Sequence, residues 1–68
     1  MNVEINGKVT EMDEGASVLD AAAAIGVEPA RGVAIALDGE VVPRGELEVT
    51  PLRDGHRVEV VVAIGGGC

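Results

Sequence analysis

The sequence contains no Phe, Tyr or Trp, so the core of this 68-residue chain must be built from Val, Ile, Leu, Met and Ala. Because Cys68 is the one cysteine, an internal disulfide is excluded. A zinc site or an iron–sulfur cluster held by this chain's own thiolates is excluded for the same reason. We expect no bound cofactor, no metal and a cytoplasmic location. The length predicts one domain, near the lower limit for a self-sufficient core.

Long apolar runs and basic residues are also scarce. The longest apolar stretch, residues 60–64, is too short to cross a bilayer, and the first residues lack the features of a signal peptide. The chain has 5 basic and 12 acidic residues, which gives a net charge of −7. Nucleic acid is therefore not an expected partner, because its phosphates must be neutralised. The charge would steer the protein toward a partner with a basic face, but the need for solubility explains it equally well.

The chain begins with a predicted hairpin. Val3 and Ile5 alternate with polar residues, as in a half-buried strand, and Asn6-Gly7 is a strong turn signal. A three-residue turn with a bulge would pair Val9 with Ile5, whereas a strict two-residue turn would leave Val9 on the other face. We favour the bulge because it buries Val9.

A short helix is predicted after the hairpin, over about residues 18–25. Ser17 and Asp20 resemble a capping box at its start, and Gly26 ends it. Four residues fall on one stripe at helical spacing, namely Val18, Leu19, Ala22 and Ile25. The helix is short and contains four consecutive alanines, so packing on a sheet must stabilise it.

The second half predicts a strand pair, a crossover and a last strand. The strands are residues 33–37, 40–42 and 57–64. The crossover of residues 44–51 is expected to be irregular, with at most one helical turn, and Leu47 and Leu52 are its expected anchors to the core. The last strand is apolar on both faces, so we expect it to be central and parallel to the first. The fold class is α+β: a ubiquitin-like β-grasp, with a mixed sheet of four to five strands and one main helix on one face. Residues 1–64 form this domain, and residues 65–68 form a flexible glycine tail.

One helix covers only one face of such a sheet, so the other face is a candidate partner interface. Its expected residues are Ala34, Ala36, Val61, Ala63 and Ile64. Alternatively, crossover residues such as Leu47 fold over this face and bury it.

The tail Gly65-Gly66-Gly67-Cys68 is unusual after so apolar a strand. Glycine loses more backbone entropy on ordering than any other residue, so this run should stay mobile. Its slim backbone can enter a narrow cleft and bring a carboxyl group to a reactive centre. A frayed end or a leftover linker is the alternative interpretation.

Residues 33–44, residues 52–55 with residues 57–60, and the closing Gly66-Gly67 resemble the ThiS sulfur carriers of thiamin biosynthesis. The resemblance implies that the Gly67 carboxylate is adenylated by an ATP-using adenylyltransferase related to ubiquitin activators. It also implies that a cysteine desulfurase or another sulfur donor converts this group to a thiocarboxylate, which passes its sulfur to thiazole synthase. Such a carrier is no enzyme and has no catalytic residues. Consistently, the sequence offers no apparent nucleophile–base pair.

Proteins with other functions have the same fold and a similar tail. A MoaD-like or other pathway-specific carrier would serve molybdopterin, cysteine or a secondary metabolite, although MoaD-type proteins usually are longer and have aromatic residues. A β-grasp interaction module with a meaningless tail is a rival from another class.

Two residues depart from the family pattern. His56 stands where an acid is common, and we expect it to be a solvated turn residue. Cys68 extends the chain one residue beyond the usual terminal glycine, Gly67. We expect a protease to remove Cys68, but it could be a cloning addition, or its thiol could take a direct part through an N-to-S acyl shift.

Removal of Cys68 predicts that the sulfur-loaded protein from its native host ends at Gly67, because only then does the slim tail end in a glycine carboxylate. Intact-protein mass spectrometry measures this directly. Sulfur-loaded protein that retains Cys68 would contradict the prediction.

Overall fold

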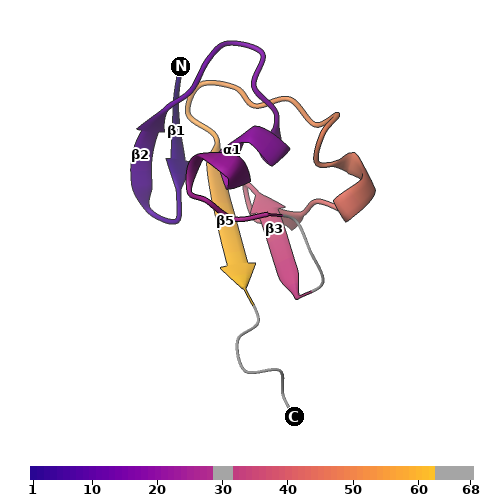
Figure 1. Ribbon diagram of the computed structural model, residues 1–68. Helices are drawn as coiled ribbons and strands as arrows, with labels where there is room; N and C mark the ends of the chain where they lie inside the picture. Colours follow the sequence, from indigo (N-terminus) through magenta and orange to yellow (C-terminus); the bar gives the residue numbers. More distant parts are fainter. Residues whose placement is uncertain (29–31, 63–68) are drawn as a thin grey trace.

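The computed structural model describes residues 1–28 and 32–62, which form a five-stranded sheet and one α-helix. In chain order the elements are β1 (Asn2–Ile5), β2 (Lys8–Glu11), α1 (Val18–Ala24), β3 (Val33–Leu37), β4 (Glu40–Val41), the 3-10 helix η1 (Arg44–Glu46) and β5 (Arg57–Val62). The sheet order is β2-β1-β5-β3-β4. Figure 1 shows β5 between the two hairpins, with α1 across one face. The predicted α+β β-grasp is confirmed.

Strand β5 is central, as the sequence predicts. It runs parallel to β1, with Ile5 opposite Val58, and antiparallel to β3 along that strand's whole length. Val58 is fully buried and Val60 is 8% exposed, so the inward residues of β5 form part of the core under α1. Val62, expected on the same face, is half exposed near the end of the strand.

The helix begins with the predicted capping box. Ser17 Oγ accepts a hydrogen bond from the Asp20 N–H at 3.3 Å, and an Asp20 carboxylate oxygen accepts one from the Ser17 N–H at 2.8 Å. The helix ends at Ala24, and Gly26 follows with a φ of 76°, a conformation that glycine adopts readily. Ile25 is 40% exposed, so its expected place on the buried stripe is wrong, because the helix has already ended there. The buried helical residues are Val18, Ala21 and Ala22.

The crossover is attached to the helix side of the sheet. Leu47 and Leu52 are buried in the core, as predicted. The Leu47 carbonyl accepts a hydrogen bond from the Leu19 N–H at 3.1 Å, and the Leu52 N–H donates to the Ala16 carbonyl at 2.8 Å. Leu47 therefore does not cover the opposite face, and the alternative in which it buries that face is wrong.

The first hairpin has a two-residue turn, so the favoured bulge is wrong. Ile5 pairs with Lys8 and Glu4 pairs with Val9, while Asn6 and Gly7 have φ values of 51° and 83°. Both angles are those of a type I′ turn, whose twist matches that of the flanking strands. Val9 is 68% exposed on the face opposite the helix. Burial could not select the bulged register, because β2 is an edge strand that is largely exposed.

Two neighbouring valines on β5 give a test of the central placement. Val60→Asp puts a carboxylate into the core and should cost on the order of 4 kcal/mol, close to the whole stability of a small domain. Val61→Asp puts the same group on the exposed face and should change the stability by less than about 1 kcal/mol. Chemical denaturation followed by circular dichroism measures both. Equal stability of the two variants would refute the central, one-sided burial of β5.

Candidate functional site

The sheet face opposite α1 is exposed where β3 and β5 lie side by side. Ala34 pairs with Val61, and Ala36 pairs with Glu59. Ala34 is exposed, Ala36 is half-buried and Val61 is 61% exposed. The structure thus brings together the three predicted interface residues that it describes. We call this surface the outer face, comprising the outward residues of the five strands.

Two further valines extend the outer face, and the sequence analysis missed both. Val41 of β4 pairs with Ala36, and Val9 of β2 pairs with Glu4; both valines are exposed. Residues that pair directly across strands project to the same face. The two-residue register of the first hairpin was the signal that could have placed Val9 here.

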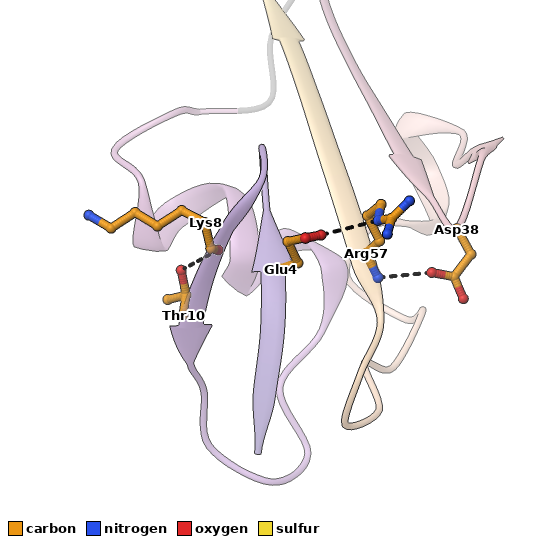
Figure 2. Close-up of polar contacts among 5 residues, drawn as sticks. All are labelled: Glu4, Lys8, Thr10, Asp38 and Arg57. Atoms are coloured by element: carbon orange, nitrogen blue, oxygen red, sulfur yellow. Dashed lines mark hydrogen bonds and ion pairs between the residues drawn. The ribbon is translucent and has the colours of Figure 1, made fainter.

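The charged residues of the outer face are mainly acidic. Glu4, Glu11 and Glu59 project from it, together with Arg57. Arg57 Nε donates a hydrogen bond to a Glu4 carboxylate oxygen at 3.2 Å, as Figure 2 shows. The Arg57 side chain is largely exposed, so this ion pair contributes at most about 1 kcal/mol to stability. The face therefore combines small apolar side chains with a net negative charge.

The start of β5 is fixed by the turn between β3 and β4. The Arg57 N–H donates to Asp38 Oδ1 at 2.8 Å, as Figure 2 shows. The Asp38 N–H in turn donates to the Arg57 carbonyl, also at 2.8 Å. Asp38 has a φ of 49° and Gly39 a φ of 88°, so this turn is also of type I′. An aspartate tolerates the left-handed conformation because its side chain can hydrogen-bond nearby backbone groups.

His56 is half-buried, so the expectation of a solvated turn residue is wrong. Its Nδ1 accepts a hydrogen bond from the Arg53 N–H at 2.9 Å, and its Nε2 lies 3.8 Å from an Asp38 carboxylate oxygen. The imidazole holds the turn before β5 closed.

The expected residues of the chain end lie outside the described residues. These are Ala63, Ile64, Gly65, Gly66, Gly67 and Cys68. Within residues 1–28 and 32–62, no group of three or more His, Cys, Asp or Glu side chains is arranged to hold a metal ion. No helix in that part of the chain has the length and apolar character needed to span a membrane.

Comparisons with known proteins agree with the resemblance found in the sequence. The family model described as "ThiS family" matches residues 2–67. A crystal structure of the thiamine biosynthesis protein (ThiS) from Geobacter metallireducens is 36% identical, with a TM-score of 0.78, and covers 98% of this chain and 100% of that one. A solution NMR structure of a thiamine biosynthesis protein from the same organism is also 36% identical, with a TM-score of 0.76, and covers 100% of this chain and 90% of that one. No curated protein sequence matches.

Proposed function

The chain belongs to the ThiS family, and we propose that it is a sulfur carrier of thiamin biosynthesis whose reactive group is the carboxylate of Gly67. The observation that carries this proposal is the family match, which extends to residue 67 and so includes the terminal glycines. The two similar solved structures are both of thiamine biosynthesis proteins, which supports the assignment to this pathway. Within the pathway we propose thiazole synthase as the sulfur acceptor.

The proposed chemistry activates a carboxylate that is a poor electrophile on its own. The Gly67 carboxylate oxygen attacks the α-phosphorus of ATP on a partner adenylyltransferase, and pyrophosphate leaves. The persulfide sulfur of a cysteine desulfurase then attacks the carbonyl carbon, AMP leaves, and a thiol reductant cleaves the S–S bond of the resulting acyl disulfide. With sulfide as the donor, the same substitution of AMP needs no reductant. The product is a thiocarboxylate, which donates its sulfur to thiazole synthase. The carrier itself supplies the acyl group and needs no catalytic side chain, so it is a co-substrate of its partners.

Two features of the chain bear on access to the Gly67 carboxylate. Cys68 adds a side chain and a thiol after Gly67, so we propose that a protease removes Cys68 before adenylation. Adenylation also requires ATP, and the need for ATP supports our proposal that the protein acts in the cytoplasm.

The folded domain is the part of the carrier that the partner enzyme binds. The outer face offers small and apolar side chains at Ala34, Ala36 and Val61, and these lie on the strand that leads to the tail and on its neighbour β3. We include Ala63 and Ile64 in this interface on the strength of the sequence alone. The acidic residues around the apolar ones favour a partner surface with apolar and basic side chains.

Reconstitution tests the carrier function. A chain ending at Gly67, incubated with an adenylyltransferase of the ubiquitin-activator type, ATP and sulfide, should gain the mass difference between oxygen and sulfur. Gly66→Val should block this gain, because the added Cβ and methyl groups keep the tail out of a narrow cleft. Its fold should be unchanged by circular dichroism. An interaction module would show no mass gain in either protein, and that result would refute the proposed function.

Two exposed valines give a matched test of the interface. Val61→Arg removes an apolar contact from the outer face and adds a positive charge, so we expect about tenfold weaker binding to the adenylyltransferase. Val49→Arg makes the same change at a residue that is 73% exposed and lies in the crossover, outside the sheet, and should bind as the wild type does. Isothermal titration calorimetry measures both affinities. Equal affinities of the two variants would exclude the outer face as the docking surface.

A further inference from the structure

The side chain of Asn6 bonds to β5 at the point where β1 stops pairing with it. The parallel pairing of these strands ends at Ile5 opposite Val58, and the Asn6 N–H still donates to the Val58 carbonyl at 2.9 Å. Asn6 Oδ1 then accepts a hydrogen bond from the Val60 N–H at 2.7 Å, and Asn6 Nδ2 donates one to the Val60 carbonyl at 3.2 Å. The side-chain amide thus takes the place of the peptide group that a longer β1 would present.

This contact depends on the two-residue turn. With φ values of 51° and 83°, Asn6 and Gly7 turn the backbone away toward β2 while the side chain of Asn6 stays beside β5. Asparagine suits the position for two reasons. It tolerates the left-handed conformation, and its amide carries both a donor and an acceptor.

Val60 consequently has a neighbour on each side. Ile35 of β3 pairs with it on one side, and the Asn6 amide bonds to it on the other. Val62 also pairs with β3, through Val33. Both backbone polar groups of Val60 bond to Asn6, and among the described residues Val60 is the last one of β5 with a hydrogen bond toward the β1 side. The chain continues from this strand to the glycines that carry the proposed chemistry.

We propose that Asn6 is a positioning residue that fixes the direction in which the chain leaves the sheet toward Gly67. The inference rests on the proposed carrier function. A β5 end that is held in advance reduces the conformational entropy lost when a partner binds the outer face and the tail together. Asn6 acts through Val60 and touches no reacting atom.

The chain contains a matched control for Asn6. Asp38 occupies the same position in the second type I′ turn and holds β5 at Arg57, at the opposite end of the strand. Glycine is compatible with the φ values of both residues, so Asn6→Gly and Asp38→Gly keep their turns. Asn6→Gly removes the side-chain hydrogen bonds to Val60, and Asp38→Gly removes the one to Arg57 together with the contact to His56. Asn6→Asp is a second, nearly isosteric variant. It keeps an acceptor for the Val60 N–H and places an oxygen against the Val60 carbonyl in place of the donor.

Native-state hydrogen exchange and steady-state kinetics test the proposal together. Asn6→Gly should reduce the protection of the Val60 amide about tenfold, and Asp38→Gly should reduce that of Arg57 instead. When adenylation is measured by the release of pyrophosphate, Asn6→Gly should raise the KM of the adenylyltransferase for the carrier about fivefold at unchanged kcat. Asn6→Asp should raise it in the same direction. Asp38→Gly should have the KM of the wild type.

The outcomes separate the two claims. A wild-type KM for Asn6→Gly, despite lost protection at Val60, overturns the positioning role and leaves the carrier function standing. An equal rise in KM for Asn6→Gly and Asp38→Gly also overturns it, because the effect would then follow stability in general. Absence of adenylation in the wild-type chain ending at Gly67 overturns the carrier function and the positioning role with it.

Discussion

The parallel pairing of β1 with β5 is the constraint on which the rest of the structure depends. It joins the two ends of the sequence, places Val58 opposite Ile5 and makes the last strand the centre of the sheet. A strand in this position must be apolar toward the helix, and Val58 and Val60 meet that demand. The core is built without aromatic residues, and the helix contributes the small side chains of Ala21 and Ala22 to it. The glycines thus follow, in the sequence, a strand that pairs with β1 on one side and β3 on the other.

Much of the fold could be predicted because its signals are local. The alternation in β1, the capping box at Ser17 and the glycines of the turns each depend on neighbouring residues, and they gave the element order. The central place of β5 followed from its apolar character on both faces. The register of the first hairpin could not be obtained in this way. Whether Val9 is buried depends on what covers the edge strand β2, and that is a tertiary property.

The functional features also differ in whether the sequence could reveal them. The outer face followed from simple geometry, since one short helix cannot cover both sides of a sheet. The contacts of Asn6 with Val60 join residues that are 54 positions apart in the sequence, so no local pattern could reveal them. The same applies to His56, whose partner Asp38 lies in the turn between β3 and β4. In both cases a turn residue contacts a segment that is distant in the sequence.

The central claim is that the carboxyl carbon of Gly67 is the atom on which the sulfur is carried. NMR spectroscopy of a chain ending at Gly67, with glycine labelled at its carboxyl carbon, observes that atom directly during incubation with adenylyltransferase, ATP and sulfide. The account predicts that the signal of the terminal carboxylate disappears and that a thiocarboxylate signal replaces it, while the signals of the folded domain persist. A terminal carboxylate signal that stays unchanged while sulfur becomes attached elsewhere in the protein would contradict it.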